Sequence, residues 1–139
     1  MTYESLKKLL KLAISTQNPD LLQKSIELYW EFEEKILLEN EFNQLIITPN
    51  HDQYQYLLKY LQDQLKYPSS VKFLDEVLSK GFEYMNHYSE DGAKAKWFSH
   101  ALASIGTPEA IDVLKKHAAS DNDEIKVEML YRLSRINSF

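Results

Sequence analysis

The sequence predicts an all-α protein, a short right-handed α-solenoid of antiparallel helix pairs with an N-terminal helical extension. Three observations support this fold class. Apolar residues recur every three or four positions along most of the chain, which is the spacing of one helix face. The three glycines and four prolines stand between these segments, where helices end and begin. No alternating run of apolar and polar residues bounded by turns indicates a strand.

Length and composition limit the classes of function. The 139 residues suit one domain, with N-terminal helices over residues 1–50 and repeats over residues 51–139. The absence of cysteine excludes disulfides, thiolate zinc sites and a cysteine nucleophile, and it fits a reducing cytoplasm. Apolar runs are too short to cross a bilayer, and the first residues are helical in pattern rather than a targeting signal, so no membrane partner is expected. A net charge of −5 with only Arg132 and Arg135 as arginines disfavours a nucleic-acid partner.

Three helices are expected in the N-terminal region. The first spans Thr2 to Ser15, and its apolar face consists of Leu6, Leu9, Leu10, Ala13 and Ile14. Asn18 and Pro19 are suited to the cap and first position of a second helix, which we expect to continue to Leu38. A short third helix is expected from Glu41 to Ile47.

The remainder of the chain is expected to hold five helices, because turn residues divide its helical pattern into five segments. They are His51–Leu65, Pro68–Tyr88, a helix from the Ser89–Gly92 turn to Ile105, Pro108–Ala119, and a helix from the Ser120–Asp123 turn to Ile136.

The turn between residues 105 and 108 is the most informative local feature. Gly106 suits the left-handed position just past a helix end, because it has no Cβ atom. Thr107 suits an N-cap, and Pro108 suits the first position of the next helix. A connection this short forces the two helices to lie antiparallel, which is the unit of an α-solenoid.

Part of this pattern repeats. Pro68, Val71 and Leu74 have the same spacing as Pro108, Ile111 and Leu114. Ala101-Leu-x-x-Ile-Gly likewise matches Arg132-Leu-x-x-Ile-Asn. Helix pairs repeated at such intervals are typical of solenoids.

With the run ALASIGTPEAIDVL from residue 101, the following AASDNDEI and the terminal Tyr-Arg-Leu from residue 131, the chain resembles the HEAT-like repeats of small bacterial proteins. The segment Tyr67-Pro-Ser-Ser-Val-x-x-Leu after the His51 helix fits the same pattern, so the resemblance covers about residues 51–136.

The resemblance implies a protein-binding module rather than an enzyme. Short chains of this kind look like immunity proteins, which neutralise a cognate toxin, and the acidic charge suits a basic toxin such as a nuclease. Alternatives on the same scaffold are an adaptor or scaffold protein, a lyase-like or tetrapyrrole-handling protein, and a nucleic-acid-acting protein. A pocket with clustered His or carboxylate groups would favour an enzyme. A basic concave face would favour a nucleic-acid-acting protein. An acidic concave face would favour the immunity protein.

Candidate partner-binding residues follow from the helix phase. The expected core stripes are Tyr54, Leu57, Leu58, Leu61 and Leu65; Phe98, Ala101, Leu102 and Ile105; and Met129, Leu130, Leu133 and Ile136. The opposite faces carry aromatic residues mixed with charges, which is the composition of interface hot spots. The residues predicted to bind a partner are Asp52, Tyr56, Lys59, Tyr60, Asp63, Lys96, Trp97, His100, Val127 and Tyr131. Burial of this face under the N-terminal helices is the alternative.

Six of the nine tyrosines are concentrated in one stretch, where they either contribute to an interface or line the edge of the core. These are Tyr54, Tyr56, Tyr60, Tyr67, Tyr84 and Tyr88.

No constellation in the sequence predicts catalysis, a metal or a cofactor. No two histidines have the spacing of a helical zinc site. Glu83 and His87 lie four residues apart and favour a surface ion pair. Glu27, Glu31 and Glu34 share one side of a helix and favour a solvated face over acid–base chemistry.

Overall fold

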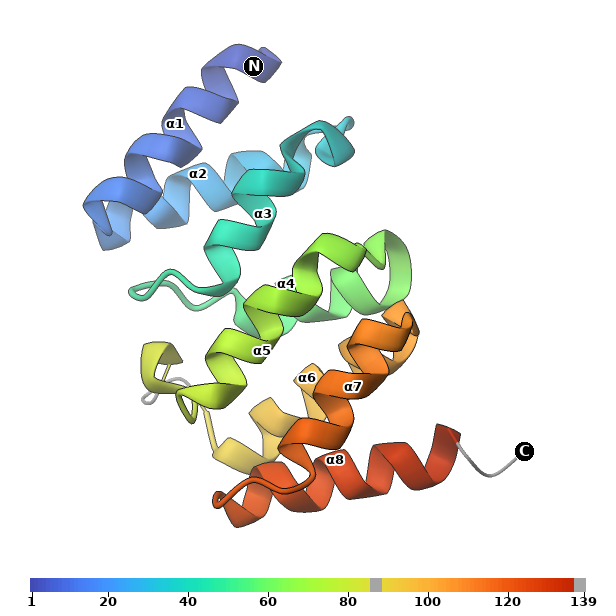
Figure 1. Ribbon diagram of the computed structural model, residues 1–139. Coiled ribbons are helices and arrows are strands. Elements are labelled where there is room, and N and C mark those ends of the chain that lie inside the picture. Colours follow the sequence, from blue (N-terminus) through green and yellow to red (C-terminus); the bar gives the residue numbers. More distant parts are fainter. Residues whose placement is uncertain (86–88, 137–139) are drawn as a thin grey trace. The chain divides into compact units, whose positions relative to one another are not determined.

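A computed structural model describes residues 1–85 and 89–136, apart from the side chain of Tyr84. Every regular element among them is a helix, which confirms the all-α class. The chain forms two compact units, Met1–Tyr54 and Gln55–Phe139 (Figure 1). The finer expectation of a right-handed solenoid stays a prediction.

The first unit contains three α-helices, α1 (Tyr3–Thr16), α2 (Pro19–Glu31) and α3 (Glu39–Ile46). Side chains cap the first two as expected: Thr2 accepts a hydrogen bond from the Ser5 amide at 3.1 Å, and Asn18 accepts one from the Leu21 amide at 3.0 Å. Helix α1 packs against both α2 and α3. Its fully buried residues are Leu6, Leu10 and Ala13.

The prediction that the second helix continues to Leu38 is wrong. Phe32 is extended, with ψ 127°, and a 3₁₀ turn, η1 (Lys35–Leu38), follows. The buried face of α2 includes Tyr29, so one more helical turn would carry Glu33 to that face. Burial of an unpaired carboxylate is costly. The break leaves Glu33 exposed and buries Leu38 instead.

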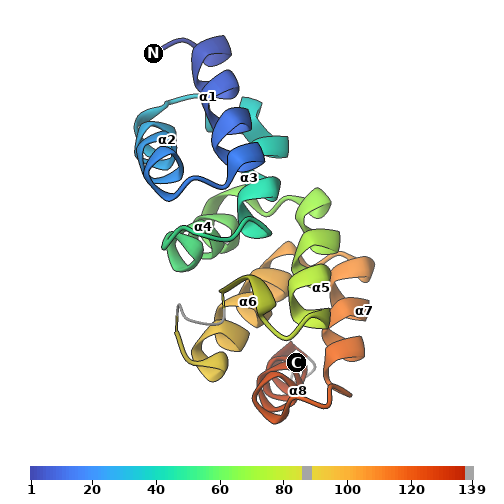
Figure 2. The ribbon, with the colours of Figure 1, turned by 90° about the vertical axis from the view of Figure 1, so that its left-hand side faces the viewer.

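The second unit contains most of α4 (Tyr54–Tyr60), which continues into a π-helical turn, η2 (Leu61–Leu65). A short 3₁₀ turn, η3 (Pro68–Ser70), leads into α5 (Val71–Ser79), and another, η4 (Glu83–Met85), follows it. The remaining helices are α6 (Asp91–Ile105), α7 (Pro108–His117) and α8 (Asp123–Ile136). Helix α6 packs against α7, α8 and η2, and α5 lies beside α7 (Figures 1 and 2).

Two further predicted helices have different bounds in the structure. The helix predicted from His51 begins only at Tyr54, because the His51 ring bonds the Leu45 carbonyl and the Gln53 amide at 2.8 and 3.1 Å and holds residues 51–53 outside it. The helix predicted from Pro68 to Tyr88 begins as a 3₁₀ turn and ends at Ser79. Gly81 and Phe82 then turn the chain with φ of 60° and 65°. Tyr88 itself lies outside the described residues.

The turn at Gly106 is as predicted. Gly106 ends α6 in the left-handed conformation, with φ 69°, and its amide donates to the Leu102 carbonyl at 3.0 Å. Thr107 caps α7, since its Oγ1 atom accepts a hydrogen bond from the Ala110 amide at 3.2 Å. Pro108 occupies the start of α7. This short connection places α6 against α7.

Two of the three predicted core stripes are correct for most of their residues, and the third is partly out of phase. In α4, α6 and η2, only Leu65 and Ile105 of the predicted set are half-buried, and the others are buried. In α8 the fully buried residues are Ile125 and Met129, whereas Leu130 is 48% exposed and Leu133 and Ile136 are half-buried. Helix α8 packs against α6 and α7, and the flank that carries Leu130 stays in solvent.

A buried cation that the sequence did not reveal holds the start of α6. Lys94 is fully buried, and its Nζ atom donates to the Met85 carbonyl at 2.9 Å. The same atom pairs with Asp91 at 3.2 Å and lies 5.0 Å from the centre of the Phe82 ring. Burial of a lysine is tolerated here because its charge is paired and hydrogen-bonded. Asp91 also accepts a hydrogen bond from Asn122, just before α8, at 3.2 Å.

Candidate binding surface

All ten residues predicted to bind a partner have solvent-accessible side chains. Tyr60, Trp97 and His100 are half-buried, and the other seven are exposed. Three of the exposed residues are large and hydrophobic: Tyr56, Val127 and Tyr131, which are 59%, 61% and 54% exposed. Asp52 belongs to the first unit, where it accepts a hydrogen bond from the neighbouring Gln53 side chain. The candidate surface therefore comprises the other nine residues.

Helix α6 forms the centre of this surface because it packs against η2 on one side and α8 on the other. His100 lies on α6, Lys59 on α4 next to η2, and Tyr131 on α8. The η2 turn is tied to α6 by the Ser104 hydroxyl, which donates to the Gln62 carbonyl at 2.5 Å. Lys59 and Asp63 form an exposed ion pair at 2.9 Å along the same face.

Arg132 is the principal residue that the predicted set lacks. Its Nη2 atom lies 2.8 Å from Nε2 of His100. Arginine has no acceptor and keeps its protons, so Nε2 of His100 must accept this hydrogen bond. His100 is therefore neutral in this arrangement and carries its proton on Nδ1. The Arg132 Nε atom also donates to the Ser99 hydroxyl at 3.5 Å, and its guanidinium carbon lies 5.4 Å from the centre of the Tyr131 ring.

The charges around His100 are positive. Burial lowers the pKa of His100 below its ordinary value, and the neighbouring charges of Arg132, Lys96 and Lys59 lower it further. We call these four residues the basic cluster. Within the described residues, neither Lys96 nor Arg132 forms an ion pair with a carboxylate. A chain with a net charge of −5 thus concentrates cations at the centre of this surface.

An apolar patch adjoins the basic cluster on α8. Val127, Leu130 and Tyr131 share the face opposite the buried Ile125 and Met129, and they are 61%, 48% and 54% exposed. Tyr131 connects this outer face of α8 to the basic cluster through its contact with Arg132. Exposed apolar side chains on adjacent turns beside an arginine have the composition of a protein interface.

The repeat in the sequence contained a signal for Arg132. The match between Ala101-Leu and Arg132-Leu also pairs His100 with Tyr131. Equivalent positions on neighbouring repeat helices lie close together, so Arg132 could have been expected near His100. The set of residues predicted from the helix phase nevertheless omitted Arg132.

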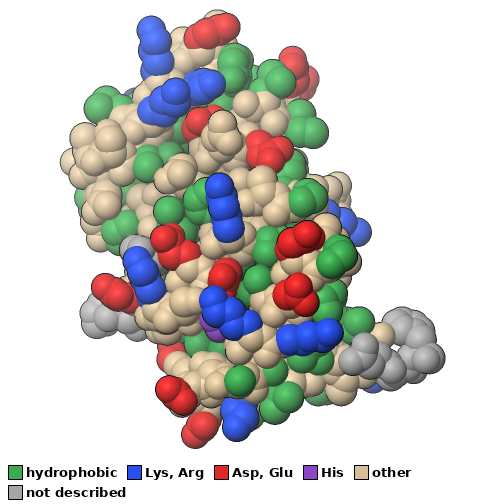
Figure 3. Space-filling model, viewed as in Figure 1, with side chains coloured by type: hydrophobic (Ala, Val, Ile, Leu, Met, Phe, Trp, Pro, Cys, Tyr) green, Lys and Arg blue, Asp and Glu red, His purple; other side chains and the backbone are tan. Residues whose placement is uncertain are grey.

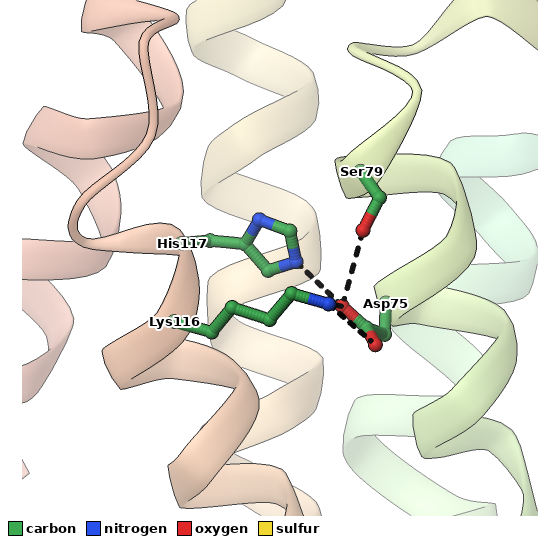
Figure 4. A network of polar contacts seen from close by, with 4 residues as sticks. All are labelled: Asp75, Ser79, Lys116 and His117. Atoms are coloured by element: carbon green, nitrogen blue, oxygen red, sulfur yellow. Dashed lines mark hydrogen bonds and ion pairs between the residues drawn. The ribbon is translucent and has the colours of Figure 1, made fainter.

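A second polar cluster, which the sequence did not predict, joins α5 to α7 (Figure 4). Nε2 of the buried His117 lies 2.7 Å from Oδ1 of Asp75. Lys116 donates to both carboxylate oxygens of Asp75 at 3.1 and 3.2 Å, and the Ser79 hydroxyl donates to Oδ1 at 3.3 Å. Burial raises the pKa of Asp75, but the hydrogen bonds and charges of His117 and Lys116 outweigh it and hold that pKa below its ordinary value.

This second cluster lacks the geometry of a catalytic site. Ser79 bonds the carboxylate of Asp75 and not the imidazole of His117, so the described side chains of this cluster form no hydrogen-bonded pair of nucleophile and base. An open hollow of about 390 Å³ adjoins Asp75, with Lys72, Glu109 and Val113 among its lining residues.

On the face drawn in Figure 3, acidic and basic side chains are interspersed, without a large field of one sign.

The remaining predicted features carry little chemistry. Glu27 and Glu31 are exposed on α2 and Glu34 is exposed just beyond it, in keeping with the expected solvated face, and His87, the expected partner of Glu83, lies outside the described residues. Tyr54 and Tyr67 are core residues, whereas Tyr56 faces solvent; Tyr88 and the Tyr84 side chain are not described. Over residues 1–85 and 89–136, no three His, Asp or Glu side chains converge on a metal-sized site. None of the helices in that part of the chain combines the length and apolar character that a membrane crossing needs.

Three comparisons with known proteins found no relative of this chain. A scan against protein-family models, a search of curated proteins and a search of solved structures each found no match. The resemblance to HEAT-like repeats therefore stays a prediction.

Proposed function

We propose that this chain is a protein-binding module whose binding surface is formed by the exposed residues of α4, α6 and α8. The observation that supports this most strongly is the outer face of α8. Val127, Leu130 and Tyr131 are about half or more exposed there, next to Arg132. Large exposed apolar side chains that adjoin each other mark interaction sites on soluble domains.

The residue types on this surface suit a protein partner. Tyrosine, tryptophan and arginine dominate interface hot spots, and Tyr56, Trp97 and Arg132 are all solvent-accessible here. The hydrogen bonds of Arg132 to His100 and Ser99 hold its side chain in place before a partner arrives. A side chain that is already ordered loses less conformational entropy on binding.

The local charge favours an acidic surface on the partner. The net charge of −5 suggested a basic partner, but the basic cluster places Lys59, Lys96 and Arg132 at the centre of the surface. Affinity and orientation depend on the charges at the interface more than on the net charge of the whole chain. A nucleic acid would meet this cluster but would be repelled by the overall negative charge.

In its most specific form the proposal is a cytoplasmic immunity protein of HEAT-like repeats that covers the active surface of a toxin. The Gly106–Pro108 hairpin and the packing of α6 between η2 and α8 support the repeat architecture. The toxin partner rests on the sequence resemblance alone.

Calorimetry with the product of the adjacent gene tests this specific form. A complex whose affinity falls at least about tenfold when Val127 and Tyr131 are both changed to Ser supports it, as expected for hot-spot residues. Leu12→Ser is the matched control, because Leu12 is 52% exposed on α1. No complex with that product overturns the immunity form, and equal losses in the two variants overturn the assigned surface.

The broader proposal can be tested without a named partner. A photo-crosslinking amino acid is placed at position 131 in the native host, and at position 12 as the control. A discrete protein adduct that forms only from position 131 supports a binding module with this surface. Identical adduct patterns from both positions contradict it.

A further inference from the structure

We propose that Arg132 and His100 together form a carboxylate-binding site, which receives an aspartate or glutamate side chain of the protein partner and takes up one proton as it does so. This inference rests on the proposed function and specifies the chemistry of the partner. Its components are an ordered guanidinium, an imidazole whose Nε2 lone pair is held by that guanidinium, and two further ammonium groups.

The guanidinium is arranged to accept a planar anion. Arg132 uses its Nε and Nη2 atoms in the bonds to Ser99 and His100, and both acceptors are neutral. Guanidinium carries five N–H donors in a fixed plane, so donors remain for a carboxylate. The Tyr131 ring, 5.4 Å from the guanidinium carbon, limits the directions in which the side chain can turn.

Positive charge reaches His100 from every helix that contributes to the site. Lys59 approaches from α4, Lys96 lies one turn away on α6, and Arg132 comes from α8. Asp63 neutralises part of this charge through its exposed pair with Lys59. The other two cations have no carboxylate partner within the described residues, so a bound anion would relieve their mutual repulsion.

The proton step follows from the hydrogen bond between Arg132 and His100. Nε2 of His100 accepts this bond at 2.8 Å in the free protein and has no room for a proton. A carboxylate first accepts from the remaining guanidinium donors of Arg132 and then replaces Nε2 of His100 as the acceptor of the Nη2 donor, so the released Nε2 can take up a proton. An N–H bond forms at Nε2 as an O–H bond of a hydronium ion breaks and leaves water, and the imidazolium donates to the same carboxylate. Binding therefore strengthens as pH falls from about 8 to about 6.

A protein carboxylate fits this site better than a long phosphate backbone does. The whole chain has two arginines and a net charge of −5, so a long phosphate backbone would meet repulsion beyond the basic cluster. The exposed Val127 lies on the turn before Tyr131, so the same segment of a partner could place an apolar side chain beside its carboxylate. An acidic segment with an apolar neighbour matches both features.

Nuclear magnetic resonance titration of the full chain with a hexaglutamate peptide tests the inference. We expect the peptide to shift the His100 imidazole resonances, to raise the titration midpoint of His100, and to bind at least about fivefold more tightly at pH 6 than at pH 8. The Arg132→Gln variant should weaken binding about tenfold, and Arg132→Lys less, because lysine keeps the charge and loses the planar donors.

Two further variants separate charge from position. Lys126→Gln removes one exposed positive charge from the same helix and should change binding less than about twofold. His100→Gln should bind at pH 8 and lose the pH dependence, because glutamine can still accept from Arg132 but cannot take up a proton.

The outcomes distinguish this inference from the proposed function. Affinity that is equal for Arg132→Gln and Lys126→Gln, or independent of pH, overturns the carboxylate site even when the crosslink from position 131 forms. Tighter binding of inorganic phosphate or of a single-stranded oligonucleotide than of hexaglutamate overturns the choice of a carboxylate. The absence of hexaglutamate binding also overturns it. If no specific protein adduct forms from position 131, in contrast, the proposed function is overturned.

Discussion

The Nε2 atom of His117 lies 2.7 Å from Oδ1 of Asp75, and this contact joins two helices across 42 positions of sequence. His117 is 5% exposed and ends α7, whereas Asp75 lies in the middle of α5. Helix α5 is followed by a segment with two consecutive positive φ angles, at Gly81 and Phe82, before α6 begins. The contact therefore holds α5 against α7 directly, in addition to the chain segment that connects the two helices through α6.

Replacing His117 should destabilise the second unit. We expect His117→Ala to lower the free energy of unfolding by about 1–3 kcal/mol, because a buried donor is lost and the carboxylate loses a partner. Lys116→Ala is the control, since its side chain is 58% exposed and its pair with Asp75 should contribute less than about 1 kcal/mol. Urea unfolding of both variants measures the difference, and similar losses would show that the His117 contact contributes nothing beyond an exposed pair.

Acid should destabilise the first unit through His51. Burial lowers the pKa of His51 to about 4, although the Leu45 carbonyl and Asp52 favour its charged form. The unfolded chain takes up this proton near pH 6.5, so the stabilisation is complete above about pH 6.5 and is lost as pH falls toward 4. The loss should reach at most about 3 kcal/mol.

Urea unfolding from pH 7 to pH 4.5, followed by a probe in the first unit, measures this effect. His51→Gln should flatten the pH profile of that unit. His100→Gln is the control, because burial and nearby cations lower the pKa of His100 as well, but it lies in the second unit. An unchanged profile in His51→Gln would mean that other groups account for the acid sensitivity.

The turn between α6 and α7 should depend on a glycine. Gly106 has a φ of 69°, and an added Cβ atom would lie 3.4 Å from the Ala103 carbonyl oxygen. Gly106→Ala should therefore cost about 1–2 kcal/mol in the free energy of unfolding. Gly92 lies in the first turn of α6, where a Cβ atom meets only the Glu124 side chain, at 3.6 Å or more. Thermal unfolding should show Gly92→Ala as neutral or slightly stabilising, and the reverse order would contradict the assigned turn.

The side chain of the buried Lys94 should contribute more to the free energy of unfolding than that of its exposed neighbour Lys96. Lys94→Met removes the hydrogen bond to the Met85 carbonyl and the pair with Asp91, and should cost about 1–3 kcal/mol. The same change at Lys96 removes an exposed charge and should stay within about 0.5 kcal/mol. Equal unfolding midpoints in urea would exclude a structural role for the buried ammonium.

Features set by neighbouring residues were predictable from the sequence. The helix ends at Gly106 and Thr107 follow from local conformational preferences, and the structure has both. The overlong second helix shows the limit of that approach. The helical pattern continues past Phe32, but the core contacts of Tyr29 fix a phase that would bury Glu33. That conflict arises from tertiary packing, which a single pattern does not contain.

For the same reason, the sequence predicted only part of the surface. Helix periodicity indicated that Tyr56, Val127 and Tyr131 face solvent, and they do. The partners of His100 and His117 come from other helices, 32 and 42 positions away in the sequence. Such pairs depend on how helices pack, so the periodicity of one helix could not identify them.

The central claim is that the exposed residues of α4, α6 and α8 bind a protein partner. Amide chemical-shift mapping of the full chain in complex with the protein crosslinked from position 131 tests it most directly. We expect the largest changes on Tyr56, Trp97, His100 and Tyr131. Changes concentrated instead on the hollow of about 380 Å³ in the first unit, which Leu28, Glu31 and Phe32 help to line, would contradict it.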